Sequence, residues 1–175
     1  MAEKKTKIVL GADVINHFVR GGQLSLLPKI LPEFQFIVLD IVKKELPALI
    51  LSELDKIINR EKSIKEVIFG ATSMERKEYF RLTATNGMHL GRGESACMVY
   101  CRYNNDVVGS SNTKDVTDYC NEHGITFLTT NDFLFYAIHR GMLTKEEAER
   151  FIKKVINLGS NPPVVDFSKY VCTKI

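Results

Sequence analysis

Short, continuously apolar segments that each lead into a helical pattern are the feature that most restricts the fold of this chain. Residues 7–12, 34–39 and 125–130 are such segments, and shorter apolar runs lie at 64–69 and 107–109. Continuously apolar strands are typical of parallel sheets that are covered on both faces, and the alternation of strands with helices favours the same arrangement. The pattern predicts an α/β protein: a three-layer α/β/α domain with a central, mostly parallel sheet of about five strands.

The size and composition of the chain limit its class. With 175 residues, 45% of them hydrophobic and 26% charged, the chain is expected to form one globular domain. No apolar run approaches the roughly 18–20 residues that span a bilayer, and no apolar segment follows the charges at the N-terminus as in a secretory signal. We therefore expect no membrane partner.

A net charge of +3 allows a nucleic-acid partner. The four cysteines have no disulfide spacing, which favours a reducing, cytoplasmic location.

The last strong amphipathic pattern ends near residue 156, which suggests the domain organisation. Residues 1–156 are predicted to form the α/β domain. Residues 157–175 are predicted to form a C-terminal tail, packed on the same domain or on a partner, with a short edge segment at 163–167. The adjacent prolines Pro162 and Pro163 make this tail a poor helix.

The strongest functional signal lies in residues 90–115. A glycine turn precedes a helix that is predicted to begin at Glu94, and residues 96–101 make this helix apolar around most of its circumference. Such a helix is usually buried. A carboxylate in its first turn is stabilised by the free N–H groups and by the helix dipole.

A polar turn follows the strand at 107–109. In this turn, Asn112 and Asp115 have the spacing of an N-cap residue with an acid at the third helical position. The next strand, 125–130, leads into a helix for which Asn131 or Asp132 is the expected N-cap.

Two further acids follow predicted strands. Asp13 comes after the first strand, at the edge of an open α/β sheet where ligands bind, although Asp is also a common N-cap residue. Glu45 lies on the helix after the second strand, and the neighbouring Lys43 and Lys44 allow a solvated charged face instead. His17 follows Asp13 by one helical turn, which places it near the same edge.

Asp13, Glu45 and Glu94 together suggest a divalent metal site. Carboxylate oxygens suit Mg²⁺ or Mn²⁺, and a cation would remove the repulsion between them. It would also orient a phosphodiester and activate water for in-line attack. No glycine-rich dinucleotide or triphosphate motif is present to suggest another ligand.

The motifs around these acids resemble those of the PIN-domain ribonucleases, in the branch whose third acid stands in the form Leu90-Gly91-Arg92-Gly93-Glu94. The resemblance runs from about residue 7 to residue 156. It implies a PIN-like fold, Mg²⁺ or Mn²⁺ held by Asp13, Glu45 and Glu94, and endonucleolytic cleavage of RNA. Many members are toxins of bacterial toxin–antitoxin pairs and form homodimers, so it also implies a small antitoxin protein and a second copy of the chain as partners.

The chain departs from the family pattern after the strand at 107–109. The family has an aspartate there, often two, whereas this chain has Ser110, Ser111 and Asn112. Asn112 offers a neutral oxygen as a metal ligand, and Asp115 lies one helical turn further on. Asp132 resembles the last acid of the family but ranks below these two, because its strand is expected one position further from the first strand.

Three functional interpretations therefore stay open. The first is an active endoribonuclease, with Arg92, Arg81 and Ser111 as candidate RNA contacts. The second is a degenerate PIN-like domain that binds RNA or a protein without cleavage. The third, another α/β metal phosphohydrolase, is weaker, because Ile15 stands where the second acid of an Asp-x-Asp motif belongs.

Overall fold

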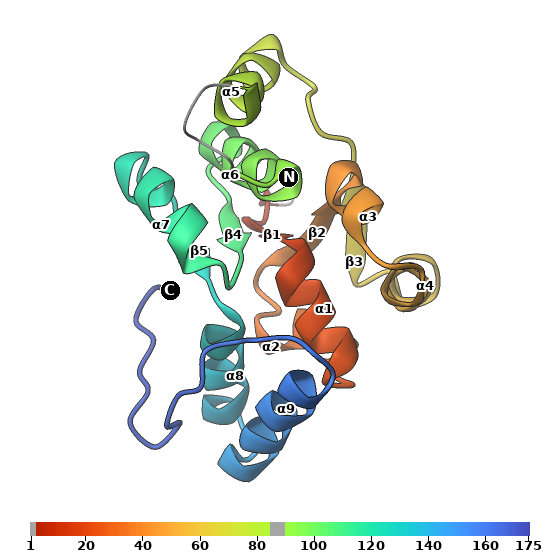
Figure 1. Ribbon diagram of the computed structural model, residues 1–175, viewed down its shortest axis with the longest axis vertical. Coiled ribbons are helices and arrows are strands. Elements are labelled where there is room, and N and C mark those ends of the chain that lie inside the picture. Colours follow the sequence, from red (N-terminus) through yellow and green to blue (C-terminus); the bar gives the residue numbers. More distant parts are fainter. Residues whose placement is uncertain (1–2, 85–89) are drawn as a thin grey trace.

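Five short strands form the centre of the molecule, and helices cover both faces of their sheet (Figure 1). The computed structural model describes residues 3–84 and 90–175. The strands are β1 (Lys7–Leu10), β2 (Gln35–Leu39), β3 (Ile64–Val67), β4 (Val107–Gly109) and β5 (Phe127–Leu128). The helices are α1 (Ala12–Arg20), α2 (Leu27–Ile30), α3 (Asp40–Glu45), α4 (Ala48–Lys56) with the π-helical turn η1 (Ile57–Glu61), α5 (Ser73–Ala84), α6 (Arg92–Asn104), α7 (Thr113–Glu122), α8 (Thr130–His139) and α9 (Lys145–Asn157).

All five strands run parallel, in the order β3-β2-β1-β4-β5. β1 is central, with Ile8 opposite Phe36 of β2 on one side and opposite Val107 of β4 on the other. The predicted α/β class and parallel sheet are confirmed, as are the positions of β4 beside β1 and of β5 one place further out. Because the strand order reverses between β1 and β4, a crevice is expected at the carboxyl ends of these two strands.

The helices form one layer on each face of the sheet. Figure 1 shows α5, α6 and α7 on one side and α1, α8 and α9 on the other, and α4 packs beside α1. Helix α6 is buried almost all round, from Ser95 to Cys101, as its apolar sequence predicts. None of the helices in residues 3–84 and 90–175 is long and apolar enough to cross a membrane.

Several local predictions are wrong at the ends of elements. Helix α6 begins at Arg92, two residues earlier than expected, with Gly91 as its N-cap. Helix α8 is capped by Thr129, and not by Asn131 or Asp132; Asp132 completes the capping box as the third helical residue. Strand β5 has only two residues, because the segment after Leu128 turns into this cap.

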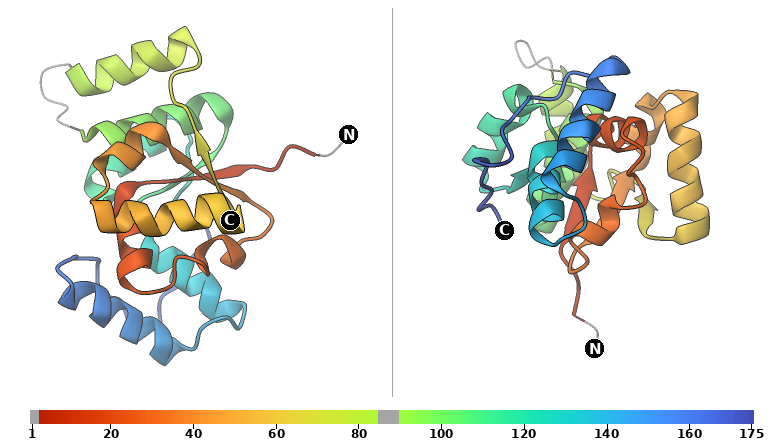
Figure 2. Two further views of the ribbon diagram at one scale, coloured as in Figure 1. Left: turned by 90° about the vertical axis from the view of Figure 1, so that its right-hand side faces the viewer. Right: turned by 90° about the horizontal axis from the view of Figure 1, so that it is seen from below.

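The tail wraps around α8 and ends beside β5 and α7 (Figure 1; Figure 2, right). It contains no strand at 163–167, contrary to the prediction, and is held by side-chain contacts instead. The hydroxyl of Tyr170 and the ammonium group of Lys174 both donate to the buried carboxylate of Asp132, the latter at 2.7 Å. The Lys174 ammonium also lies 4.2 Å from the ring centroid of Phe127, so the tail packs on the α/β domain of its own chain.

Candidate functional site

The candidate site lies at the carboxyl ends of the strands, where β1 and β4 stand side by side. Helix α1 starts there after β1, and α3 starts there after β2. Helix α6 runs back towards the start of β4, so its N-terminus comes to the same edge. The turn at 110–112 follows β4 directly, and Thr130 begins α8 after β5. Five separate segments of the chain therefore meet at this edge.

Asp13 joins two of these segments. It is the second residue of α1, so it is not the N-cap; that position is taken by Gly11, which has no side chain to cap the helix. The Oδ1 atom of Asp13 accepts a hydrogen bond from the backbone N–H of Val14 at 2.8 Å. The Oδ2 atom accepts one from the backbone N–H of Ser111 at 2.6 Å. The carboxylate thus has a donor on each oxygen and fixes the turn after β4 against α1.

Glu45 reaches the site from the exposed end of α3. Its Oε1 atom accepts a hydrogen bond from the backbone N–H of Gly93, at 2.9 Å, in the first turn of α6. A Cβ atom on Gly93 would lie 2.4 Å from the Oε2 atom of Glu45, so only glycine leaves room for this approach. The sequence did not reveal this role of Gly93; its position directly before Glu94 was the only available signal.

Glu94 is half-buried among other polar groups. Burial, together with the negative charges of Asp13 and Asp115, raises the pKa of Glu94 to about 7, and a hydrogen bond with Asn112 opposes this rise. The side-chain amide of Asn112 donates to the Oδ2 atom of Asp115 at 2.8 Å. Asn112 is the N-cap of α7 and Asp115 its third residue, as predicted, but the side chain of Asn112 makes no hydrogen bond to the helix backbone.

Cys97 is a buried thiol on which the charges of all three predicted acids have an effect. It lies one turn after Glu94, fully buried, and its thiol is 3.8 Å from the carbonyl oxygen of Leu10 at the end of β1. Burial raises the pKa of the Cys97 thiol, and the charges of Asp13, Glu94 and Glu45 raise it further. The negative charges of three acids, which come from three segments of the chain, therefore all disfavour ionisation of this buried thiol.

The donor set limits what kind of metal site this edge can form. In the part of the chain that the structure describes, no three His, Cys, Asp or Glu side chains are arranged to hold a metal ion by themselves. Mg²⁺ usually keeps several water molecules and binds through one or two carboxylates. Asp13 and Glu94, with the neutral oxygen of Asn112, fit that kind of site and do not fit a cage of three carboxylates.

Two other predicted residues are engaged elsewhere. Burial acts to raise the pKa of Asp132, but hydrogen bonds from Lys174, Thr129 and Tyr170 hold it below its ordinary value. Arg81 contacts Glu78 with two nitrogen atoms, at 3.0 and 2.7 Å, and this hydrogen bonding outweighs burial and lowers the pKa of Glu78 to about 2. Asp132 therefore stabilises the tail, and Arg81 is bound within an ion pair rather than presented at the acidic edge.

Ser111 and Arg92 do lie at the edge. Arg92 is exposed as the first residue of α6. The hydroxyl of Ser111 donates to Oγ1 of Thr130 at 2.8 Å, and Oγ1 of Thr130 lies 2.8 Å from Nδ1 of His17. His17 and Thr130 are buried, and burial lowers the pKa of His17. His17 was expected near this edge, whereas no sequence pattern indicated that Thr130 connects it to Ser111.

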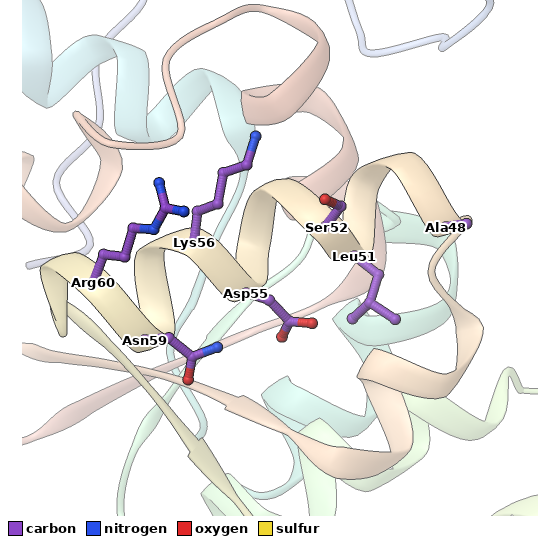
Figure 3. A pocket seen from close by; sticks show the side chains of 7 residues that line it. All are labelled: Ala48, Leu51, Ser52, Asp55, Lys56, Asn59 and Arg60. Carbon is purple, nitrogen blue, oxygen red and sulfur yellow. The ribbon is translucent and has the colours of Figure 1, made fainter.

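A separate hollow of about 500 Å³ lies on the outer surface of α4 and η1 (Figure 3). Its polar side chains do not converge: Lys56 and Arg60 point away from Asp55 and Asn59. Asp55 is paired with Lys43, whose Nζ atom lies 3.0 Å from its Oδ1. The hollow is therefore a weaker candidate than the acidic edge.

Replacing Glu94 by Gln is expected to stabilise the protein at alkaline pH. On folding, the pKa of the Glu94 carboxyl rises from 4.5 to about 7. Between these two pH values the folded state binds more protons than the unfolded state. The free energy of unfolding is therefore highest at low pH and falls as the pH rises through this range. After allowing for solvent screening, E94Q should gain about 1 kcal/mol in unfolding free energy at pH 8. Urea denaturation with EDTA would measure this gain, and a gain of the same size at pH 4 would contradict the assigned cause.

The site places Glu94 where the charges of Asp13 and Asp115 raise its pKa, and Arg92 is exposed at the start of α6. Carboxylates of this kind can bind Mg²⁺ or Mn²⁺, and an arginine can contact phosphate. No family model, curated protein or solved structure matches this chain.

Proposed function

We propose that this protein is a PIN-like, Mg²⁺- or Mn²⁺-dependent endoribonuclease. The observation that carries this proposal is the meeting of Asp13, Glu45 and Glu94 at one edge of the sheet, where Glu45 binds the amide of Gly93 directly before Glu94. Burial and the charges of Asp13 and Asp115 raise the pKa of Glu94 to about 7. The repulsion between like charges is relieved either by a proton, as the raised pKa of Glu94 indicates, or by a bound cation. The place of these acids at the switch point of the sheet, where ligands bind in open α/β folds, supports the cation.

Other poorly exposed acids of the chain support this interpretation by contrast. Asp106 is paired with Lys7, Asp132 with Lys174, and Glu78 with arginines. Among the described residues, no ion pair includes an acid of the candidate site: Asp13, Glu45, Glu94 or Asp115. The fold thus pairs three of its structural carboxylates with cations, whereas buried Glu75 accepts hydrogen bonds from Thr72 and Asn104 and the four acids of the site have no ion pair within the described part of the chain.

Each residue of the site has a defined part in the proposed reaction. Asp13 and Glu94 would hold the cation, and Glu45, Asn112 and Asp115 would contact its water molecules. A bound Mg²⁺ or Mn²⁺ would offset the negative charge that develops on the phosphodiester during in-line attack by water. Arg92, exposed at the start of α6, would bind a neighbouring phosphate of the RNA.

The wild-type protein provides the first test. Calorimetry with Mn²⁺ is expected to give a dissociation constant in the micromolar to sub-millimolar range. A labelled, random-sequence single-stranded RNA should be cut in Mn²⁺ and remain intact in EDTA. A folded protein that neither binds Mn²⁺ nor cuts RNA would overturn the proposal.

The resemblance to PIN-domain toxins extends the proposal to partners and place of action. A toxin of this type would act on RNA in the cytoplasm and would be restrained by a small antitoxin protein. Homodimer formation is the other expected association, and sedimentation of the purified chain over a range of concentrations would detect it.

A second candidate function has an observation of its own. Both oxygens of Asp13 already accept backbone hydrogen bonds, from Val14 and Ser111, and the turn at 110–112 contains no carboxylate. Asp13 would then serve to fix this turn, as in a degenerate PIN-like domain that binds RNA or a protein without cleavage. Binding of RNA that is independent of Mn²⁺ and leaves the RNA uncut would favour this candidate.

Replacing Asn112 by Asp is expected to increase the affinity for Mn²⁺ by about tenfold. The substitution adds a charge beside Glu94 and restores the acid that the family pattern has at this turn. In EDTA the same variant should be less stable than the wild type, because the hydrogen bond to Asp115 becomes a repulsion between carboxylates. Calorimetry and urea denaturation test both effects, and an unchanged affinity would argue against Asn112 as a ligand.

A further inference from the structure

A closed ring of contacts surrounds the turn after β4. The hydroxyl of Ser111 donates to Oγ1 of Thr130, and the backbone N–H of Thr130 donates to the hydroxyl oxygen of Ser111, both at 2.8 Å. Oγ1 of Thr130 meets Nδ1 of His17 at 2.8 Å. His17 lies one helical turn after Asp13 on α1, and Asp13 accepts the backbone N–H of Ser111. The ring therefore passes through α1, the turn and α8, and returns to α1.

The hydroxyl of Thr130 connects Ser111 to His17. Its oxygen accepts the hydrogen of Ser111. It also shares a hydrogen bond with Nδ1 of His17, in which the donor depends on the tautomer of the imidazole. Burial lowers the pKa of His17 and favours a neutral imidazole. The connection from Ser111 to His17 exists with either tautomer.

The ring determines where Ser111 stands relative to Asp13. The side chain of Ser111 is bound to Thr130 twice, and its amide is bound to Asp13 at 2.6 Å. Thr130 is 1% exposed and His17 6% exposed, so water does not readily replace either partner. A displacement of Ser111 would remove the shorter of the two hydrogen bonds to Oδ2 of Asp13, and the hydroxyl of Ser110 at 3.5 Å would be left as the donor to that oxygen.

We propose that Thr130 and His17 are positioning residues of the candidate site, which hold the Asp13 carboxylate in one orientation through Ser111. This inference rests on the proposed function, because two of its measurements, Mn²⁺ affinity and RNA cleavage, require it. Residues that orient a metal ligand typically contribute 10- to 100-fold to metal affinity or activity. Neither residue touches the substrate or the cation, so both act only through Ser111 and Asp13.

Thr130→Val and Thr130→Ser form a matched pair for the test. Valine keeps the shape of threonine but removes the hydroxyl, whereas serine keeps the hydroxyl. We expect T130V to lower the Mn²⁺ affinity about 10- to 100-fold and to lower kcat with little change in KM for RNA. We expect T130S to restore most of both. In NMR, the amide hydrogen of Ser111 should exchange with solvent at least about tenfold faster in T130V.

A second variant covers the case in which T130V fails to fold. Ser111→Ala removes only a hydroxyl from a half-exposed turn and should show the same loss of affinity. If wild-type protein binds Mn²⁺ and the variants bind it equally well, the positioning role is overturned and the proposed function survives. If wild-type protein binds no Mn²⁺, the proposed function fails, and the amide exchange of Ser111 alone decides: faster exchange supports the positioning of Asp13, and unchanged exchange overturns it.

Discussion

Replacing Asp13 by Asn is expected to reduce Mn²⁺-dependent cleavage at least about 100-fold and to abolish measurable Mn²⁺ binding. Asparagine removes the charge that attracts the cation. It also places an NH₂ group where Asp13 has an oxygen, and both oxygens of Asp13 face backbone donors, those of Val14 and Ser111. One of these donors must therefore lose its acceptor, so the turn after β4 should move as well.

Asp118→Asn is a suitable control for D13N, because Asp118 is an exposed acid on α7. It changes the net charge by the same amount without touching the site. Calorimetry and the RNA assay should give wild-type values for D118N. Cleavage by D13N at the wild-type rate would remove Asp13 from the site and, with it, the main support for the proposed nuclease.

Replacing Gly93 by Ala is expected to lower activity about tenfold or more while leaving stability unchanged or higher. The added Cβ atom would lie 2.4 Å from Oε2 of Glu45, so the Glu45 side chain must swing away and lose its bond to the Gly93 amide. Gly93 is helical, and alanine favours a helix over glycine by roughly 0.5–1 kcal/mol. Activity and stability should therefore change in opposite directions, which a general loss of folding cannot produce.

Gly91→Ala is the matched control in the same motif. A Cβ atom at Gly91 would lie 3.6 Å from Oε2 of Glu94, an ordinary van der Waals contact. Thermal unfolding and initial cleavage rates of both variants would test the comparison, and G91A should cleave at close to the wild-type rate. Equal losses in G91A and G93A would argue against a specific place for Glu45 at the start of α6.

The sequence was sufficient for the class of fold and for the edge of the sheet at which the acids lie. The positions of Asp13 and Glu45 after parallel strands predicted that they share one edge, because the carboxyl ends of parallel strands meet there. Glu94 reaches the same edge because a crossover helix runs back along the sheet. These inferences depend only on the direction of the strands, and the structure has all strands parallel.

The details that the sequence did not provide depend on contacts between distant segments. Residues 129–132 read Thr-Thr-Asn-Asp, and each of these residues can cap a helix, so only the end of β5 determines that Thr129 is the cap. Asn112 and Asp115 have capping spacing, yet the amide of Asn112 donates to Asp115 within the acidic site. The hydrogen bonds from Ser111 to Thr130 and from Gly93 to Glu45 link residues 19 and 48 positions apart, and no local pattern contains them.

The hydrogen bond from the Ser111 amide to Asp13 joins residues 98 positions apart, so it cannot form until residue 111 has been synthesised. A ribosome adds about 5–20 residues per second, so the turn after β4 is synthesised roughly 5–20 s after Asp13. Until then, β1 lacks its neighbour β4, and Asp13 lacks the amide of Ser111 that holds its carboxylate. A nuclease built in this way would be inert until the turn after β4 has been synthesised, and translation products that end before this turn would not damage the RNA around them.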